Sequence, residues 1–188
     1  MVNSVFKCIR CTGCCFFKNY EDAPVVYPWE KRVLEQYAKI RGVSVVFKPF
    51  LVYRSSCRAV VVLYKWVING YCPFYDKSRR SCTIYRDRPF ACKMYPLILG
   101  LRDNTLRLST ACRWVQEVLG ETPASIDPSK VFPYEYSIAI KNFVKLKYLS
   151  EMLKSMGFTE EVVSREEHLS EAVDVDNYVD IDVEFSNG

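Results

Sequence analysis

The sequence contains nine cysteines, and their spacing is the feature best suited to chemistry. The first four form the run Cys8-Ile-Arg-Cys11-Thr-Gly-Cys14-Cys15, in which two C-x2-C steps overlap. A C-x2-C step lets a tight turn direct two sulfurs at one centre while nearby backbone N–H groups donate to the thiolates. Bacterial ferredoxins bind an iron–sulfur cluster with the same triple spacing. Gly13 fits such a segment because glycine lets the backbone curl closely around a bulky centre.

The adjacent pair Cys14 and Cys15 adds a geometric constraint. Neighbouring side chains on an extended chain point to opposite sides. One metal centre would therefore take both thiols only where the backbone bends sharply. The geometry favours the other possibility, in which the pair divides between two centres.

Four more cysteines follow the opening run: Cys72, Cys82, Cys92 and Cys112. Together the two sets supply eight thiols, which is enough for two four-thiolate sites. All-thiolate ligation suits both tetrahedral zinc and iron–sulfur clusters. The lone His168 lies in the acidic C-terminal part and is not expected to be a ligand. Cys57 is expected to be a buried small hydrophobic residue and not a ligand.

The residues around these cysteines form four motifs. They are the opening run, Tyr-Cys72-Pro-Phe-Tyr, Ser-Cys82-Thr-Ile-Tyr-Arg-Asp-Arg-Pro-Phe-Ala-Cys92-Lys-Met-Tyr-Pro and Ala-Cys112-Arg-Trp. In this order they resemble the YkgJ-like CxxCxxCC family over about residues 8–114. The resemblance implies a zinc- or iron-chelating domain whose metal ligands are Cys8, Cys11, Cys14, Cys15, Cys72, Cys82, Cys92 and Cys112. Related domains occur in flagellin lysine methylases, but this chain is too short to add a full methyltransferase domain.

The surroundings of the cysteines bear on which metal they bind. An iron–sulfur cluster held by thiolates is an anion, so nearby cations and helix N-termini stabilise it. Arg86, Arg88 and Lys93 flank the stretch from Cys82 to Cys92. Bulky aromatic residues could exclude water from the centre: Phe16, Phe17, Phe74, Tyr75, Tyr85, Phe90 and Tyr95. Zinc would accept the same surroundings, but the ferredoxin-like spacing favours an iron–sulfur cluster, [4Fe–4S], present once or twice.

These observations predict an iron–sulfur protein with a redox or electron-transfer role and a protein redox partner. The first alternative is a structural zinc module that binds protein or nucleic acid, and the second is a cluster-dependent enzyme accessory related to lysine methylases. The sequence holds no GxGxxG, P-loop or nucleophile-elbow motif, and no catalytic residue is assigned. Arg79 and Arg80, beside Ser78, form the basic spot expected to be most exposed. No RNP, KH or helix-turn-helix signature accompanies them.

Charge and hydropathy set the expected compartment. The longest apolar run, Ala59 to Tyr64, is too short to span a bilayer, and the first residues do not resemble a signal peptide. We therefore expect a cytoplasmic protein without a membrane partner, where clustered thiols bind metal more often than they form disulfides. The scarcity of glutamine, which occurs only at Gln36 and Gln116, hints at a thermophile.

Charged residues are distributed unevenly along the chain. Residues 1–150 contain 24 of the 26 Lys and Arg but only 11 of the 22 Asp and Glu. The basic part could attract nucleic acid or an acidic partner. The simpler expectation is that the acidic residues after 150 fold back and neutralise part of it. The acidic positions after Asp174 do not match a calcium-binding loop.

The elements that must position the cysteines are short. Proline near the start and glycine past the end predict a helix over 28–41 and the longest helix over 132–156. Shorter helices are expected over 87–95 and 112–119. Strands are expected at 43–47, 50–53, 59–68 and 179–185, and a hairpin should pair 97–101 with 105–109. The fold class is therefore α+β, a small single domain organised around the metal centre, with the cysteine motifs in 1–120 and the long helix and acidic tail in 121–188.

Overall fold

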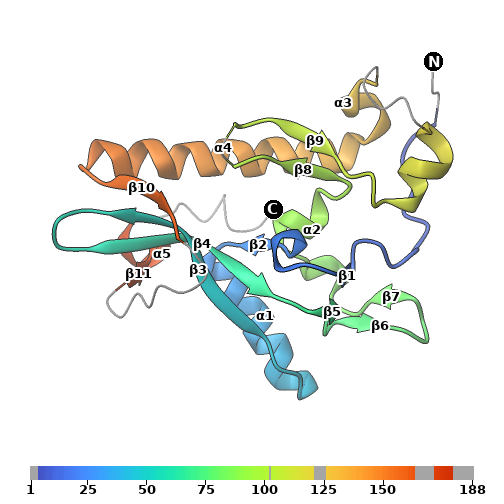
Figure 1. Ribbon diagram of the computed structural model, residues 1–188, viewed down its shortest axis with the longest axis horizontal. Coiled ribbons are helices and arrows are strands. Elements are labelled where there is room, and N and C mark those ends of the chain that lie inside the picture. Colours follow the sequence, from blue (N-terminus) through green and yellow to red (C-terminus); the bar gives the residue numbers. More distant parts are fainter. Residues whose placement is uncertain (1–3, 102, 121–125, 164–171, 180–188) are drawn as a thin grey trace. The chain divides into compact units, whose positions relative to one another are not determined.

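The computed structural model describes residues 4–101, 103–120, 126–163 and 172–179. Short helices, one long helix and small, mainly antiparallel sheets give the α+β fold predicted from the sequence (Figure 1). The chain divides into two compact units, each made of two segments distant in sequence. Unit 1 comprises Met1–Lys18 and Gly70–Phe143, and unit 2 comprises Asn19–Asn69 and Val144–Gly188. The division at residue 120 stays a prediction, because compactness alone does not show which segments bind metal.

Unit 2 is built on a five-stranded sheet in the order β10-β3-β4-β11, with β2 also paired to β4. Its strands are β2 (Val25–Val26), β3 (Val46–Arg54), β4 (Ala59–Val67), β10 (Thr159–Val162) and β11 (Ala172–Asp174). Strands β3 and β4 form a long antiparallel hairpin, whereas β11 runs parallel to β4. Val52 and Val61 pair across this hairpin and pack with Val163 in a small core.

Helix α1 (Pro28–Arg41) of unit 2 has the predicted bounds. Pro28 occupies its first position, the Glu30 carboxylate accepts the Tyr27 N–H at 3.0 Å, and Gly42 ends the helix with a φ of 64°. The short elements η1 (Tyr20–Asp22) and α5 (Val175–Tyr178) complete the unit.

Within unit 2, the described acidic residues Asp174 and Asp176 fold back onto basic and polar side chains. Arg32 of α1 forms ion pairs with Asp174 and Asp176, and the Tyr64 hydroxyl donates to the Asp174 carboxylate. The predicted strand over 179–185 is not found at Val179, which directly follows α5, and the rest of that strand lies outside the described residues.

Unit 1 consists of small elements that follow the cysteine motifs. They are β1 (Phe16–Phe17), β5 (Gly70–Tyr71), β6 (Tyr75–Asp76), β7 (Ser81–Cys82), η2 (Tyr85–Asp87), α2 (Phe90–Lys93), β8 (Leu97–Leu99), β9 (Leu106–Leu108), η3 (Val115–Leu119) and α3 (Pro128–Val131). Strand β1 pairs with β5, β6 with β7 and β8 with β9, all antiparallel. The β8–β9 pair confirms the predicted hairpin. Helix α4 (Pro133–Ser155), the predicted longest helix, begins in unit 1 and ends in unit 2, and Gly157 follows it with a φ of 84°.

Two predicted helices of unit 1 are shorter than expected. Proline disfavours helical backbone at the residue before it, so Arg88 is extended and helix α2 begins only at Phe90, after Pro89 as N-cap. Asp87 is therefore not the N-cap that the sequence suggested. In the segment predicted as a helix over 112–119, a π-helix takes up Val115–Leu119, ended by Gly120 with a φ of 59°.

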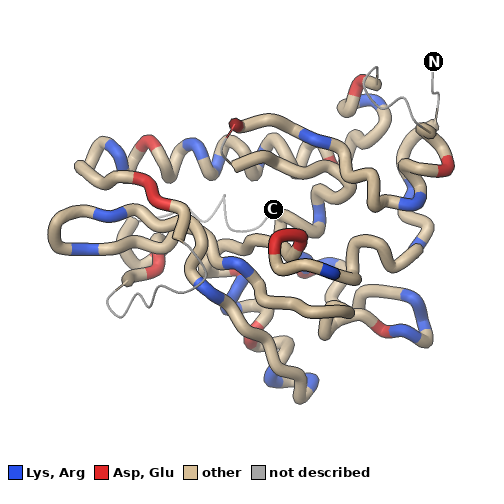
Figure 2. The backbone as a smooth tube through the Cα atoms, viewed as in Figure 1, with Lys and Arg blue, Asp and Glu red and all other residues tan. Residues whose placement is uncertain are grey.

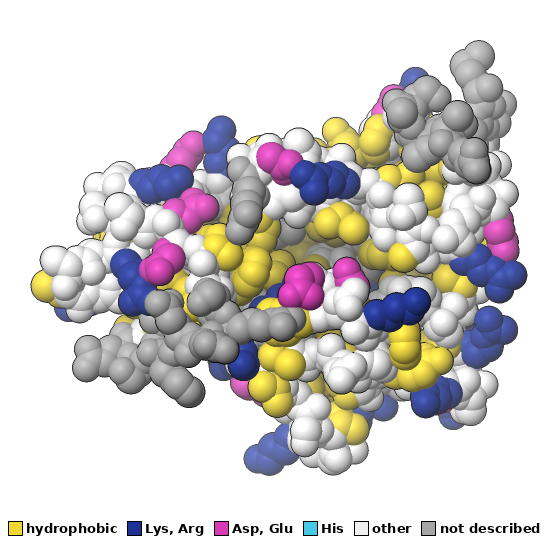
Figure 3. Space-filling model, in the orientation of Figure 1, with side chains coloured by type: hydrophobic (Ala, Val, Ile, Leu, Met, Phe, Trp, Pro, Cys, Tyr) yellow, Lys and Arg dark blue, Asp and Glu magenta, His cyan; other side chains and the backbone are white. Residues whose placement is uncertain are grey.

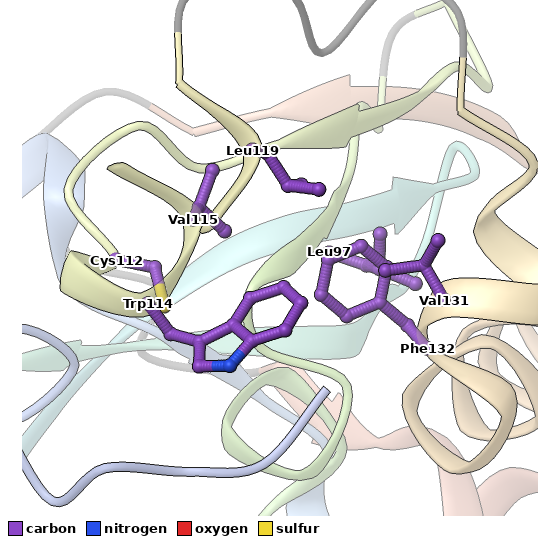
Figure 4. Packing of buried hydrophobic residues seen from close by; sticks show 7 residues of the cluster. All are labelled: Leu97, Cys112, Trp114, Val115, Leu119, Val131 and Phe132. Atoms are coloured by element: carbon purple, nitrogen blue, oxygen red, sulfur yellow. The ribbon is translucent and has the colours of Figure 1, made fainter. Parts of the chain in front are cut away.

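The core of unit 1 includes one of the predicted ligands. Figure 4 shows seven buried side chains converging from the β8, 112–119 and 131–132 segments: Leu97, Cys112, Trp114, Val115, Leu119, Val131 and Phe132. Trp114 and Phe132 contact each other edge to face, with ring centroids 5.7 Å apart. The Cys112 side chain is 4% exposed and packs in this core. One predicted ligand is therefore part of the hydrophobic core of unit 1.

Among the described residues, none of the helices combines the length and apolar character that crossing a bilayer requires.

Candidate metal centre

The opening cysteine segment is fixed at its start by the core of unit 1. Phe6 lies against Trp114 edge to face, with centroids 5.1 Å apart, and also packs on Phe132. Its backbone N–H donates to the Val131 carbonyl at 2.7 Å. The chain therefore enters the cysteine run from a fixed point two residues before Cys8.

A second fixed point lies in the middle of the run. A Cβ placed on Gly13 would lie 2.7 Å from the Ala111 carbonyl oxygen, closer than real Cβ contacts come. Glycine is therefore needed here to let two backbones approach, which is one of the roles expected of it. This approach brings the turn between Cys11 and Cys14 beside Cys112.

The end of the run is joined to the second cysteine motif by the β1–β5 pair. Phe16 is opposite Tyr71 in register, and the Cys72 N–H donates to the Cys15 carbonyl at 2.8 Å. The β6–β7 pair then places Tyr75 opposite Cys82. Backbone pairing thus connects the motifs of Cys15, Cys72 and Cys82.

The backbone bends sharply at Cys14 and Cys15, which was the less favoured of the two predicted possibilities. The Cys15 N–H donates to the Thr12 carbonyl at 2.8 Å, and the two sulfurs are only 3.7 Å apart. Arg10 and Thr12 have φ values of 53° and 77°, which are unusual for residues with a side chain and especially for β-branched threonine. Such backbone strain concentrates at functional sites, and here it directs neighbouring thiols to the same side.

The structure places seven of the eight predicted ligands in two groups of thiols whose charges influence one another, and Cys14 belongs to both groups. The main group comprises Cys14, Cys15, Cys72, Cys82 and Cys92. A hydrogen bond with Cys14 and burial raise the pKa of Cys15, and the charges of Cys72 and Cys92 raise it further. Burial also raises the pKa of Cys92 well above its usual range, and the charges of Cys72, Cys14 and Cys82 raise it further. Close, partly buried thiols that resist ionising together are what a bound cation would stabilise as thiolates.

The remaining members of the set lie around Cys112. Burial raises the pKa of Cys112, and the charges of Cys11 and Cys14 raise it further. Cys14 therefore faces both Cys112 and the main group. Its own pKa is lowered to about 7, chiefly by the hydrogen bond with Cys15 and, against burial, by the positive charge of Arg88.

Backbone N–H groups point at two of the sulfurs. The Phe74 N–H hydrogen-bonds to the Cys72 sulfur, and the Trp114 and Val115 N–H groups hydrogen-bond to the Cys112 sulfur. Each of these hydrogen bonds lowers the pKa of the thiol that accepts it. Donation of this kind stabilises thiolates and tunes a metal centre bound to them.

Arg88 is the cation directed at the thiols. Its Nε donates to the Tyr85 carbonyl at 3.0 Å, and its guanidinium lies over the Tyr85 ring, 3.8 Å from the centroid. Held in this way, its charge lowers the pKa of Cys14 and opposes the rise at Cys92. The sequence suggested Arg86, Arg88 and Lys93 as cations near the thiols and did not favour any of them. Arg88 differs from the other two in the extended backbone that Pro89 imposes on it.

Two cysteines stand apart from the thiol set. Cys8 is exposed at the start of the run. Cys57 is also exposed, not buried as predicted, because it lies in the turn between β3 and β4, where Ser55 and Arg58 are joined by a backbone hydrogen bond. It belongs to unit 2, whereas all eight predicted ligands belong to unit 1. His168 lies outside the described residues.

All nine cysteines, each of them among the described residues, are free thiols. Within that same part of the chain, no three His, Cys, Asp or Glu side chains already have the arrangement of a metal site. Unmetallated thiolates repel one another at ligand distance, so the metal itself supplies the energy that draws them together. The donor set is nevertheless of the right kind: thiols only, partly buried, with N–H donors and one cation directed at them. It fits zinc and an iron–sulfur cluster alike.

Other groups of the site were not visible in the sequence. The N–H donors to Cys72 and Cys112 depend on local backbone direction, which the residue types do not reveal. Tyr85 was expected only as a cover against water, but it anchors Arg88. Of the aromatic cover, Phe74 and Phe90 are buried, whereas Phe16 and Tyr85 are exposed.

Comparison with known proteins points in the same direction. A family model, CxxCxxCC, described as "Putative zinc- or iron-chelating domain", matches residues 7–114, more than half of the chain. An uncharacterized protein of Methanocaldococcus jannaschii is 27% identical over 104 residues, which cover 55% of this chain and 51% of that protein. The matched part therefore spans about half the length of this relative. No solved structure matches the chain.

Proposed function

The chain belongs to the CxxCxxCC family, and on that premise we propose that its cysteines hold an iron–sulfur cluster with a redox or electron-transfer role. Metal binding itself is the function that the family description supports. The choice of iron–sulfur chemistry and of a redox role is our proposal.

The number of thiols in electrostatic reach of one another carries this proposal. A structural zinc ion takes four ligands, whereas the main group contains five cysteines and Cys14 also faces Cys11 and Cys112. A polynuclear cluster, or two centres that share the opening run, makes fuller use of this set. The triple C-x2-C spacing of the run supports the same choice.

The residues of the chain have clear tasks in this proposal. Four of the five thiols Cys14, Cys15, Cys72, Cys82 and Cys92 would hold one cluster, and the fifth, with Cys11 and Cys112, would be available to a second centre. The N–H groups of Phe74, Trp114 and Val115 stabilise the thiolates, and Arg88 compensates negative charge. When bound, such a cluster supplies one-electron transfer at a potential set by these hydrogen bonds and charges.

An optical experiment tests the redox role. Anaerobically purified protein should be brown, absorb near 400 nm and bleach reversibly with dithionite. A colourless protein that carries stoichiometric zinc and shows no change with dithionite would overturn the proposal.

A structural zinc module is the second candidate, and the position of Cys112 favours it. This cysteine is buried in the core of unit 1, so a metal bound there would stabilise the fold directly. A structural zinc site supplies on the order of 10 kcal/mol of folding free energy. In that case removal of the metal by a chelator would unfold unit 1, and the protein would show no absorption in the visible range.

A further inference from the structure

Exposed aromatic rings and basic side chains lie together on unit 1, beside the cysteine motifs. Phe16 and Tyr71 are 41% and 42% exposed although both are large and apolar. They stand opposite each other in the β1–β5 pair, with ring centroids 4.8 Å apart. Tyr75 stacks on Tyr71 with centroids 5.7 Å apart and an angle of 11° between the rings. Three aromatic rings therefore form one continuous, partly solvent-exposed surface.

Positive charge is concentrated beside these rings. The tip of the β6–β7 hairpin has the sequence Lys77-Ser78-Arg79-Arg80, and all four residues are exposed. The Lys77 ammonium lies over the Tyr71 ring, 4.4 Å from its centroid. Figure 2 shows blue basic segments and one red acidic segment in this hairpin. In Figure 3, hydrophobic and basic side chains alternate over this part of the face.

The one acidic residue at the tip does not neutralise it. The Asp76 carboxylate accepts hydrogen bonds from the Ser78 N–H, the Ser78 hydroxyl and the Arg79 N–H, at 2.7 to 3.0 Å. Its ion pair is with Arg79, at 3.7 Å, and not with Lys77 or Arg80. The sequence of unit 1 as a whole has 14 Lys and Arg against 7 Asp and Glu, so the surroundings are also basic.

We propose that this platform, formed by Phe16, Tyr71, Tyr75, Lys77 and Arg80, binds single-stranded nucleic acid. Bases stack on the exposed aromatic rings, and successive phosphates contact the basic hairpin tip. A basic surface with interleaved aromatic rings is the usual means of binding single strands without sequence preference. An acidic protein would match the positive charge but would not supply bases to stack on the exposed aromatic surface. The inference holds for either metal, since it concerns a surface beside the centre.

Fluorescence anisotropy with the metal-loaded full chain tests the proposal. The probe is a labelled oligouridine of about 12 nucleotides, titrated at several salt concentrations between about 50 and 200 mM. Tyr71→Ala should weaken binding about tenfold or more, because it removes a stacking ring. Tyr134→Ala is the matched control: Tyr134 is 54% exposed, lies in α4 within unit 1, and is not part of the platform.

The basic residues have their own matched variants. Lys77→Ala with Arg80→Ala should weaken binding and reduce the salt dependence, by roughly 0.7 in slope for each phosphate that is no longer neutralised. Arg107→Ala with Lys130→Ala removes the same charge from side chains already paired with Asp103 and Asp127, and should leave the slope unchanged. Equal affinity and slope in both double variants would overturn the proposal.

Two further measurements separate stacking from simple charge attraction. Uridine monophosphate should compete only weakly, because it offers one base and one phosphate. Polyglutamate of equal charge should not displace the oligonucleotide, and its equal competition would overturn the proposal.

If Tyr71→Ala does not fold, photocrosslinking of the unmodified protein to a bromouracil oligonucleotide provides the test. Crosslinks are expected at Phe16, Tyr71 or Tyr75, and crosslinks only elsewhere would contradict the platform.

Discussion

The backbone of Gly13 lies so close to the Ala111 carbonyl oxygen that a Cβ at Gly13 would be 2.7 Å from it. This approach joins the opening cysteine run to the segment of Cys112, which is nearly 100 residues later in the sequence. Because the opposing atom belongs to the backbone, it cannot rotate away as a flexible side chain would. The position of the Cys11–Cys14 turn therefore depends on a residue without a side chain.

Gly13→Ala should displace the opening run from Ala111 and lower the metal content of the purified protein. Overpacking of this kind also costs about 1 to 3 kcal/mol of unfolding free energy. Gly42→Ala is a suitable control, because a Cβ there meets nothing within 4 Å and the residue ends helix α1 in unit 2. It should cost about 1 kcal/mol through its positive φ while metal content stays full. Full metal content and unchanged stability in Gly13→Ala would show that the close approach does not matter.

Cys92→Ser should lose metal and destabilise the fold severely. Cys92 lies at the centre of the main thiol group, where Cys14, Cys72 and Cys82 all influence its ionisation. Cys57→Ser is the matched control, since Cys57 is exposed in a turn of unit 2. Metal per chain, measured by mass spectrometry on anaerobic protein, should fall in the first variant only. Equal loading of both variants would remove Cys92 from the ligand set.

Arg88→Gln should lower the reduction potential of a bound cluster. The reduced cluster carries one more negative charge, and the Arg88 guanidinium stabilises it, so removal of that cation disfavours reduction. The expected shift is on the order of tens of millivolts for a partly screened charge. Arg86→Gln removes the same charge from the same η2 segment, from a side chain not anchored on Tyr85, and should change the potential less. A redox titration compares the two, and equal shifts would contradict the assignment of Arg88.

Two buried lysines of unit 2 predict how stability changes with pH. Burial lowers the pKa of Lys65 and of Lys145 to about 8 from the usual 10.5, although Lys65 donates to the Glu21 carbonyl at 2.8 Å. Between these values the unfolded chain keeps a proton that the folded chain has released. The free energy of unfolding should therefore rise with pH from about 8, by up to about 1.4 kcal/mol per pH unit for each lysine.

Denaturation at pH 8 and pH 9 measures this dependence as a difference between variants, because unfolded thiols ionise in the same range and oppose the rise equally in each protein. Lys65→Met should reduce the rise, because it removes one of the two titrating groups. Lys48→Met is the control, since Lys48 is opposite Lys65 in the β3–β4 register but is exposed. The same change in unfolding free energy between pH 8 and pH 9 in Lys65→Met and Lys48→Met would refute the prediction.

The helices of this fold could be predicted largely from their ends. Pro28 and Gly42 set the exact bounds of α1, and Pro133 and Gly157 flank α4, because proline and glycine act through local backbone sterics. The strands in the sheet of unit 2 were harder to predict from the sequence. Two separate strands were predicted over 43–47 and 50–53, but β3 runs unbroken over Val46–Arg54, and its register with β4 shifts on both sides of Leu51. Strands β10 and β11 depend on pairing with residues about 100 positions earlier, which no local pattern reveals.

The candidate site also has features that local sequence predicts and features that it does not. Cysteine spacing identified candidate ligands, because ligands near in sequence can share one turn, and their binding of metal stays a prediction. The bend at Cys14 and Cys15 was the less favoured of the two predicted possibilities, since it accompanies left-handed backbone at Arg10 and Thr12, residue types that rarely adopt this conformation. The exposure of Cys57 was also missed, because apolar character does not reveal that a residue lies at a hairpin turn.

Metal and acid-labile sulfide analysis of anaerobically purified protein tests the central claim most directly. The proposal predicts iron and sulfide in equal amounts, roughly four of each per chain for one [4Fe–4S] cluster or about eight for two. Stoichiometric zinc without sulfide would contradict it.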